Sequence, residues 1–219
     1  MKVSIITVCF NSMTTIRDTI ESVLKQDYND IEYIIIDGKS NDMTLSIINE
    51  YNISKVVSET DLGLYDAMNK GIKLATGEII GILNSDDLYN SSDIITLIVN
   101  HFQSDVDLDI LYSDLVYVSK NNTNKIIRKW ASKSYYPTFF ENANVPPHPT
   151  VFLRNNVYKI AGLFNTNYIF ASDYDFLLRI AKKYKVEFLD LPLLRFRING
   201  RNYLDDYNLT GREKEEEKI

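Results

Sequence analysis

Residues 3–10 read VSIITVCF, a run dominated by apolar and β-branched side chains. A strand with one face in solvent alternates apolar and polar residues, so this run predicts a strand covered on both faces, as in a parallel sheet. Apolar residues then recur at helical spacing through residue 26. This pattern predicts a helix directly after the strand, with Ser12 or Thr14 as its cap.

The same alternation of strand and helix continues through residue 104. Further strands are expected at residues 31–37, 55–58 and 78–83. Further helices are expected at residues 44–51, 65–74 and 92–101, the last of them capped by Ser91 or Ser92. The predicted fold class is α/β, with a Rossmann-like, doubly wound and mostly parallel sheet that binds ligands at the carboxyl ends of its strands.

The second half of the chain has the pattern of a smaller α+β part. Strands are expected at residues 108–112, 115–118, 126–130 and 186–189, with a polar turn at 120–125 and a helix at 173–184. Residues 135–149 are rich in aromatic residues, Asn and Pro, which predicts a long functional loop. We expect one domain, with a first half (1–104), a second half (105–205) and a charged tail (206–219).

The composition of the 219 residues limits the classes of function. An apolar content of 45% is enough for a buried core, and a net charge of −6 with a pI near 5.0 argues against nucleic-acid binding. Cys9 is the one cysteine, which excludes an internal disulfide and a zinc cluster and predicts a buried thiol. No apolar run approaches the roughly 18 residues of a membrane span, and no signal peptide precedes the first strand, so a cytoplasmic location is expected.

The stretch GILNSDDLY, residues 81–89, places two carboxylates side by side where the fourth predicted strand ends. Asp86 and Asp87 repel each other unless a cation lies near them, although Ser-Asp-Asp is also ordinary turn chemistry. Oxygen ligands on a loop suit Mg²⁺ or Mn²⁺, which take one or two carboxylates and complete their coordination with water and substrate phosphates. The pair therefore predicts a metal site with a diphosphate as its partner.

Other acidic residues at the same edge fit a nucleotide. Asp37 ends the second strand and could accept hydrogen bonds from a base or a ribose. Residues 58–70 (SETDLGLYDAMNK) lead into a helix with Asp61 and Asp66 toward that edge, and the glycine at position 63 permits close backbone approach. The alternative is structural, with Asp66 capping its helix and Asp37 capping a turn.

Four runs of the chain, over about residues 3 to 200, resemble family 2 glycosyltransferases in their order and spacing. They are VSIITVCFN, IDGKSNDMT, SETDLGLYDAMNKGIKLATGEIIGILNSDD and PHPTVFLRNNVYKIAGLFNTNYIFASDYDFLLRI. The resemblance implies a GT-A fold, a nucleotide-diphosphate sugar donor that we expect to be a UDP-sugar, a divalent metal (Mn²⁺ or Mg²⁺), and inversion at the anomeric carbon. The implied acceptor is a hydroxyl of a glycan or a lipid-linked saccharide, as in polysaccharide or cell-envelope synthesis.

The resemblance implies that residues 1–104 bind the nucleotide sugar and that residues 105–205 bind the acceptor and carry the catalytic base. It also implies roles for residues at the strand ends. Asp37 would meet the base, Asp86 would face the ribose or the donor sugar, and Asp87 would bind the metal that bridges the two phosphates. The other residues implied to contact the nucleotide sugar are Thr7, Val8, Phe10, Asn11, Lys39, Asp66, Asn69, Lys70 and Ser85.

The catalytic base of the family is the aspartate of a Glu-Asp motif at the start of a late helix. The matching stretch is ASDYD, residues 171–175, so Asp173 aligns with the base and Ser172 replaces the usual glutamate. The Asp173 carboxylate would accept the proton of an acceptor hydroxyl as that oxygen attacks the anomeric carbon from the face opposite the diphosphate. Asp175 is then expected to be a first-turn acid favoured by the helix dipole.

The chain departs from the family pattern near the nucleotide. Gly38 stands at the second position of the common Asp-Asp-Gly-Ser motif, with Lys39 next, and Met68 stands where a helix often carries an arginine near the donor. His148 lies between two prolines and could approach the diphosphate or the acceptor, although a lone loop histidine is more often structural.

A late arginine-rich stretch also departs from the family pattern. Arg195, Arg197 and Arg201 lie where the family often has a loop that folds over the donor, and Arg197 is the candidate phosphate contact. The usual glycine pair of that loop is replaced by Asn199 and Gly200.

Two other function classes stay open on the sequence. A nucleotidyltransferase also carries acidic metal ligands on an α/β sheet, but the stretch NSMTTIRDT after Phe10 has no glycine for a phosphate-gripping loop. A non-catalytic nucleotide-sugar-binding subunit would keep the fold without turnover, and the presence of both Asp87 and Asp173 argues against it. Peripheral contact with the inner face of a membrane is left open, because no basic amphipathic helix supports it.

Overall fold

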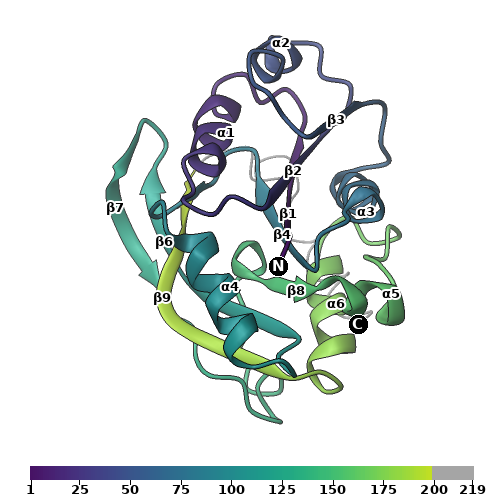
Figure 1. The fold of residues 1–219 in the computed structure, drawn as a ribbon, viewed down its shortest axis with the longest axis vertical. Coiled ribbons are helices and arrows are strands. Elements are labelled where there is room, and N and C mark those ends of the chain that lie inside the picture. Colours follow the sequence, from purple (N-terminus) through teal and green to yellow (C-terminus); the bar gives the residue numbers. More distant parts are fainter. Residues whose placement is uncertain (199–219) are drawn as a thin grey trace.

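A computed structural model describes residues 1–198 of the chain, which form a single sheet with helices on both faces (Figure 1). The expectations for Asn199, Gly200, Arg201 and the tail 206–219 lie outside these residues. The strands are β1 (Val3–Cys9), β2 (Ile31–Asp37), β3 (Lys55–Ser58), β4 (Ile79–Asn84), β5 (Leu88–Tyr89), β6 (Ile110–Ser119), β7 (Asn122–Trp130), β8 (Phe152–Arg154) and β9 (Val186–Arg197). The helices are α1 (Ile16–Leu24), α2 (Thr44–Ile48), α3 (Leu64–Leu74), α4 (Ile94–Ser104), the short 3₁₀ helix η1 (His148–Thr150), α5 (Asn155–Ala161) and α6 (Ser172–Ala181).

The first four long strands form a parallel sheet in the order β3-β2-β1-β4, as the sequence predicts. In the pairing of β1 with β2, Cys9 lies level with Asp37, and on the other side of β1 Val8 lies level with Asn84. The carboxyl ends of these strands therefore meet at one edge. The loops that carry Asp37 and the Asp86-Asp87 pair follow directly from that edge.

Two apolar clusters cover the two faces of the sheet, which explains why strands such as IEYIIID carry apolar residues on both faces. Helices α1, α2 and α4 pack on one face, while α3, α5 and α6 pack on the other. Two close contacts need glycine. A Cβ atom on Gly71 of α3 would lie 2.4 Å from Cγ2 of Ile6, and one on Gly81 would lie 2.3 Å from the ring of Phe152.

In the second half, all four strand expectations are wrong in length, and β7 begins at Asn122, inside the expected polar turn. Residues 110–119 form one strand, β6, in place of two, because its polar pair Ser113-Asp114 stays in the ladder through a register shift against β9. The amide of Ser113 donates to the Thr150 hydroxyl at 3.1 Å, and the carbonyl oxygen of Ser113 accepts from that hydroxyl at 3.0 Å. Asp114 pairs with Lys129, so neither polar residue ends the strand. Strand β9 accordingly continues to Arg197, well past the expected end at residue 189.

The expected caps of two helices are also wrong. Helix α1 has Thr15 as its N-cap residue and α4 has Asp93, and neither side chain makes a capping hydrogen bond. Ser12 contributes through its carbonyl oxygen, which accepts from the amide of Ile16 at 2.9 Å. At the start of α1, a main-chain carbonyl oxygen rather than a side-chain hydroxyl therefore accepts this hydrogen bond.

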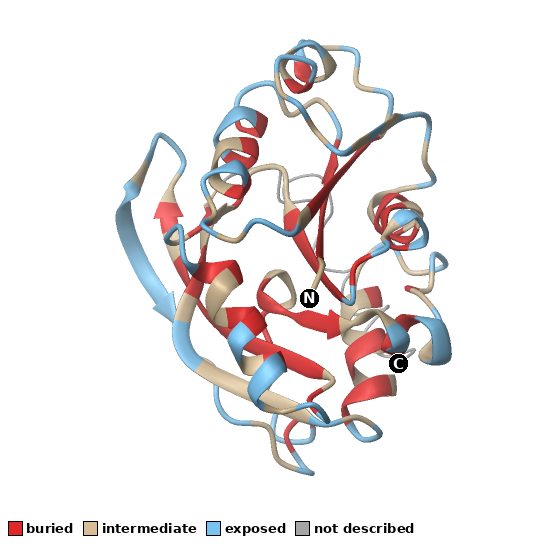
Figure 2. Ribbon diagram, viewed as in Figure 1, coloured by how far each residue is buried: buried red, intermediate tan, exposed pale blue. Residues whose placement is uncertain are grey.

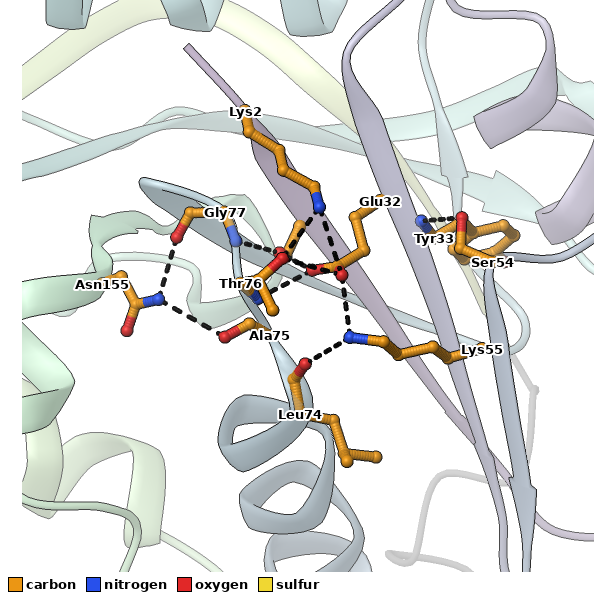
Figure 3. Close-up of polar contacts among 11 residues, drawn as sticks. Lys2, Glu32, Tyr33, Ser54, Lys55, Leu74, Ala75, Thr76, Gly77 and Asn155 are labelled. Carbon is orange, nitrogen blue, oxygen red and sulfur yellow. Dashed lines mark hydrogen bonds and ion pairs between the residues drawn. The ribbon is translucent and has the colours of Figure 1, made fainter.

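A buried carboxylate, Glu32, joins β1, β2, β3 and the turn after α3 (Figure 3). It accepts hydrogen bonds from Lys55 at 2.8 Å, from Ser4 at 2.6 Å and from the amide and hydroxyl of Thr76 at 2.7 and 2.9 Å. Burial alone would raise the pKa of Glu32, but these donors outweigh it and hold the pKa well below its ordinary value. The group is therefore an ionised structural element of the sheet.

Within residues 1–198, no helix is both long and apolar enough to cross a bilayer. Cys9 is buried and unpaired, as the sequence predicts. Burial and the neighbouring Asp37 raise the pKa of its thiol, so it stays protonated.

Candidate active site

The acidic loop, residues 84–87, begins at the last residue of β4, and its two neighbouring carboxylates differ in how far they are buried. Asp87 is 0% exposed, and its two oxygens accept from the amide of Arg197 at 3.2 Å and from Nδ2 of Asn84 at 3.0 Å. Asp86 is only partly buried, and its carboxylate has no hydrogen bond to another of the described residues. Asp86 is thus the carboxylate of the pair that remains free to bind a ligand.

Electrostatics at the acidic loop favour a cation. Burial raises the pKa of Asp86, and burial together with the Asp86 charge raises the pKa of Asp87 well above its ordinary value. A positive charge beside Asp86 would offset both effects. Among residues 1–198 no cluster of three His, Cys, Asp or Glu side chains could hold a metal, so the protein alone does not complete a coordination shell. One carboxylate plus substrate phosphates is an ordinary arrangement for Mg²⁺ or Mn²⁺, so the loop fits such an ion.

Arg197 ties the acidic loop to β9 and is not free for phosphate. Its guanidinium donates to the carbonyl oxygen of Asp86 at 3.0 Å, to that of Lys120 at 2.9 Å and to Asp18 at 2.7 Å. The side chain is buried. The arginine that the sequence nominated as a phosphate contact therefore has its guanidinium used inside the protein, where it supports the carbonyl of Asp86.

At the end of β2, Asp37 is fully buried and organises the turn that follows it. It accepts from the amide and hydroxyl of Ser40 and, at 2.6 Å, from the hydroxyl of Ser58. Asn11, with φ of 49°, accepts from the amide of Asn41 at 2.9 Å, which joins the end of β1 to the same turn. The turn chemistry that the sequence offered as an alternative for Asp37 is therefore present.

The accessible part of this edge is formed by Phe10, Gly38 and Asp61. Phe10 is 50% exposed although it directly follows a buried strand. A Cβ on Gly38 would lie 2.5 Å from Oδ2 of Asp61 and 3.4 Å from the Phe10 ring, so these three residues adjoin. Lys39, exposed and with φ of 61°, lies beside them. An aromatic face next to a carboxylate and a cation is chemically suited to a nucleoside.

Several residues expected to contact the donor have their polar atoms engaged within the protein. Thr7 is buried against the hydroxyl of Tyr33 at 3.1 Å, and Asn69 uses both ends of its amide on the backbone of Phe164. Asp66 accepts from the amide of Leu62, and Lys70 pairs with Glu59 and Asp66. Val8 is buried in the core, while Ser85 shares a hydrogen bond with Ser12 at 2.9 Å.

Asp173 lies in the first turn of α6 and is held by a residue of α3. The hydroxyl of Tyr65 donates to Oδ1 of Asp173 at 2.8 Å. Burial and the Asp173 charge raise the pKa of Tyr65 far above its ordinary value, so this phenol stays a hydrogen-bond donor. Ala171, with φ of 60°, precedes the helix and turns the chain into it. The pair fixes the carboxylate from two elements that are distant in the sequence.

His148 begins the 3₁₀ helix η1 and lies near Asp173. Strand β8 runs antiparallel to β4, with Gly81 level with Phe152, and η1 immediately precedes β8 and contacts β4. Burial lowers the pKa of His148, against an opposing effect of the Asp173 charge, so its ring is neutral near pH 7. His148 and Tyr65 both pack against Phe164, with ring centroids 5.4 and 5.6 Å from its ring, so the histidine lies beside the Tyr65–Asp173 pair.

Tyr65 and Asn84 are contacts that the sequence reasoning did not identify. An aromatic residue at helical spacing is expected in a core, and Tyr65 does pack against Phe164 with ring centroids 5.6 Å apart. Its hydroxyl gave no separate signal. Asn84 belongs to the stretch NSDD, where a third polar residue at a strand end could have suggested support for the carboxylates.

Comparison with known sequences identifies related proteins. A family model described as glycosyl transferase family 2 matches residues 4–160. The chain is 28% identical over 181 residues to a PGL/p-HBAD biosynthesis glycosyltransferase of Mycobacterium bovis, covering 80% of this chain and 68% of that protein. It is 27% identical over 201 residues to an uncharacterized glycosyltransferase of Methanocaldococcus jannaschii, covering 86% and 68%.

Comparison with solved structures shows a shared fold at low identity. TarS of S. aureus, in complex with UDP-GlcNAc, matches with a TM-score of 0.77 and 19% identity over 95% of this chain and 62% of that one. The mannosyltransferase PcManGT of Pyrobaculum calidifontis, in complex with GDP-Man and Mn²⁺, matches with a TM-score of 0.70 and 17% identity over 92% and 58%. This chain spans less than two thirds of the length of either.

Proposed function

The chain belongs to glycosyl transferase family 2, and from that premise we propose that it transfers a sugar from a nucleotide-diphosphate sugar to an acceptor hydroxyl, with inversion. The observation that carries the proposal is the hydrogen bond from Tyr65 to Asp173. It gives the Asp173 carboxylate a fixed direction beside His148, which packs with Tyr65 against the Phe164 ring. In the proposed site, this carboxylate lies opposite the acidic loop. A base and a diphosphate site facing one another are the two parts that a single displacement requires.

The proposed step is one displacement at the anomeric carbon. The acceptor oxygen attacks that carbon, its proton goes to Asp173, and the bond from the carbon to the diphosphate oxygen breaks with its electron pair leaving on the nucleoside diphosphate. Tyr65 holds the Asp173 carboxylate in place through the reaction. The neutral ring of His148 is the proposed contact for the acceptor or the diphosphate.

We assign the divalent cation, Mn²⁺ or Mg²⁺, to Asp86 rather than to Asp87, the residue that the sequence indicated. Asp86 is the more accessible carboxylate, whereas both oxygens of Asp87 already accept hydrogen bonds. A bound cation supplies positive charge that offsets the charge developing on the departing diphosphate. Asp87 then has a different role, because its contact with the amide of Arg197 holds β9 against the loop.

For the donor, we propose a UDP-sugar whose base lies on the exposed ring of Phe10, beside Gly38 and Asp61. The solved relatives support a nucleotide-sugar donor in general, since one carries UDP-GlcNAc and the other GDP-Man. Lys39 is the exposed cation at the rim of this site. The proposed acceptor is a hydroxyl of a glycan or of a lipid-linked saccharide.

The base assignment is tested by Asp173→Asn with Asp175→Asn as its matched control. Asp175 lies on the same helix, but its carboxylate bonds to Arg179 at 3.0 Å. Transfer and donor hydrolysis are measured with UDP-, GDP- and dTDP-sugars in the presence of Mn²⁺, and donor binding is measured separately by thermal shift. We expect Asp173→Asn to bind the donor as the parent does and to lose transfer, while Asp175→Asn retains it.

Two outcomes would contradict these assignments. Near-parental transfer by Asp173→Asn would remove Asp173 as the base. Donor binding by the parent protein without transfer or hydrolysis of any of the sugars would favour a non-catalytic binding subunit.

A further inference from the structure

The outermost strand of the second half, β7, stands apart from the body of the protein. It pairs with β6, and its side chains are exposed along nearly the whole strand (Figures 1 and 2). Among the residues exposed are two aliphatic ones, Ile126 at 58% and Ile127 at 52%. Adjacent exposed isoleucines on an edge strand indicate a surface that a binding partner covers.

The charge of this segment is opposite to that of the whole chain. We call residues 120–133 (KNNTNKIIRKWASK) the basic hairpin; it contains no Asp or Glu, although the net charge of the chain is −6. Its cations are Lys120, Lys125, Arg128, Lys129 and Lys133. Of these, Lys129 pairs with the buried Asp114, and the Arg128 guanidinium lies 3.9 Å from the centroid of the Tyr117 ring. Lys129 also lies 3.8 Å from Asp190, so the outward charge of the hairpin comes from the four cations that form no ion pair with a described residue: Lys120, Lys125, Arg128 and Lys133. Screening over roughly 10 Å weakens the effect of more distant acidic residues on them.

An aromatic residue completes the pattern. Trp130 lies on the same strand, stacked on Tyr117 with ring centroids 6.3 Å apart and an interplanar angle of 2°. It is partly exposed beside Arg128 and Lys129. Interleaved cations, aliphatic side chains and tryptophan are the composition of surfaces that rest at the boundary between lipid headgroups and acyl chains.

We propose that the basic hairpin is a peripheral docking surface for an anionic lipid bilayer. The cations provide attraction to anionic headgroups. Ile126 lies opposite Val118 and Trp130 lies opposite Leu115, so these two side chains project from opposite faces of β7, and the exposed edge of the strand carries its apolar area into the headgroup region. A soluble polyanion would match the cations alone and would leave Ile126 and Ile127 in water. The charge of the hairpin and its exposed apolar residues together therefore favour the bilayer.

The hairpin is coupled to the candidate active site through Arg197. The carbonyl oxygen of Lys120, in the hairpin turn, accepts from Arg197, which also donates to the carbonyl of Asp86. Docking would consequently hold the acidic loop near the bilayer, where a lipid-linked acceptor would be found. That consequence rests on the proposed function, whereas bilayer binding itself does not require the chain to be a transferase.

The experiment compares co-sedimentation of the protein with two kinds of vesicle, phosphatidylcholine alone and phosphatidylcholine mixed with phosphatidylglycerol. The test variant is Lys125→Glu with Arg128→Glu, and the control is Lys182→Glu with Lys183→Glu, which makes the same change in net charge at exposed residues of another surface. Circular dichroism checks that both variants fold. Each cation near an anionic surface strengthens binding about fivefold, so the test variant should bind at least about twenty-five-fold more weakly, and the control should bind like the parent.

Trp130 gives a second readout because it is the one tryptophan of the chain. We expect its emission to shift to shorter wavelength with anionic vesicles, to be quenched by brominated lipid, and to return as ionic strength rises. Three results would overturn the proposal: no binding to anionic vesicles at low ionic strength, equal loss in the test and control variants, or binding without quenching of Trp130. Tight binding to soluble polyphosphate without binding to vesicles would overturn it as well.

Discussion

The hydroxyl of Tyr65 donates to Oδ1 of Asp173 across 2.8 Å and joins the first turns of two helices that are 108 residues apart in the chain. Both helices lie on the same face of the sheet, within one apolar cluster. The contact gives the partly buried carboxylate of Asp173 a fixed direction. If Asp173 is the base, Tyr65 is the positioning residue that sets its aim.

Replacing Tyr65 with Phe should lower kcat about tenfold, the equivalent of one hydrogen bond to a charged group, and leave the KM for the donor unchanged. The ring contact with Phe164 is kept, so the fold should be retained. Steady-state kinetics with a saturating acceptor check this split between kcat and KM. Tyr158→Phe is the matched control, because it removes the hydroxyl of a buried tyrosine in the same cluster, whose ring stacks on Phe176, and leaves Asp173 untouched. An equal loss of kcat in the control would show that Tyr65 acts only through packing.

Asp86 and Asp87 should separate into a ligand and a structural residue. Asp86→Asn is expected to weaken metal-dependent donor binding at least about tenfold, about 1.4 kcal/mol, with little change in the urea midpoint. Asp87→Asn should instead lower the free energy of unfolding by about 1 to 3 kcal/mol, because it alters a buried acceptor of the Arg197 amide. Calorimetric titration with UDP, with and without Mn²⁺, and urea unfolding test both variants. If Asp87→Asn weakened metal-dependent donor binding and Asp86→Asn lowered stability, Asp87 would be the metal ligand.

Arg197→Lys should destabilise the acidic loop. A lysine cannot reproduce the planar set of bonds to Asp86, Lys120 and Asp18, so the donor KM should rise severalfold as stability falls by about 2 kcal/mol. Arg154→Lys is the control, since Arg154 similarly binds main-chain carbonyls, those of Leu108 and Phe102, but next to α4. The control should lose stability with an unchanged donor KM. If Arg197→Lys kept the parental donor KM, the contacts of Arg197 on β9 would not support donor binding.

Glu32→Gln should lower the free energy of unfolding by about 2 kcal/mol at pH 7, which corresponds to roughly 4 to 8 °C in Tm for a domain of this size. Glutamine cannot accept from Lys55, Ser4 and Thr76 as the carboxylate does. Because the pKa of Glu32 is lower in the folded state than in the unfolded chain, its contribution is complete above the ordinary value of 4.5 and is lost as pH falls below it. Urea titrations should therefore show parent and variant converging below that pH. A constant difference down to acidic pH would mean that Glu32 acts without its charge.

Much of the fold followed from local pattern. Runs such as residues 31–37 are apolar at every position but Glu32 and Asp37, and the structure buries nearly all of them between two helical layers. Strands β2 and β3 have the expected limits, and the GT-A fold implied by the resemblance is confirmed by the family match and the solved relatives. The failures lie where polar residues interrupt a strand, as at Ser113 and Asp114, because their partners come from other elements.

The sequence by itself determined that this chain forms a parallel sheet with carboxylates at the ends of its strands, since residue periodicity and burial on both faces are properties of neighbouring residues. Only the tertiary structure decided that Asp87 is fully buried and Asp86 only partly so, that Arg197 supports the loop, and that Tyr65 holds Asp173. Adjacent, chemically identical side chains differ only through contacts, and the contacts with Arg197 and the contact of Tyr65 with Asp173 each join residues more than a hundred positions apart. Short-range pattern carries no information about them.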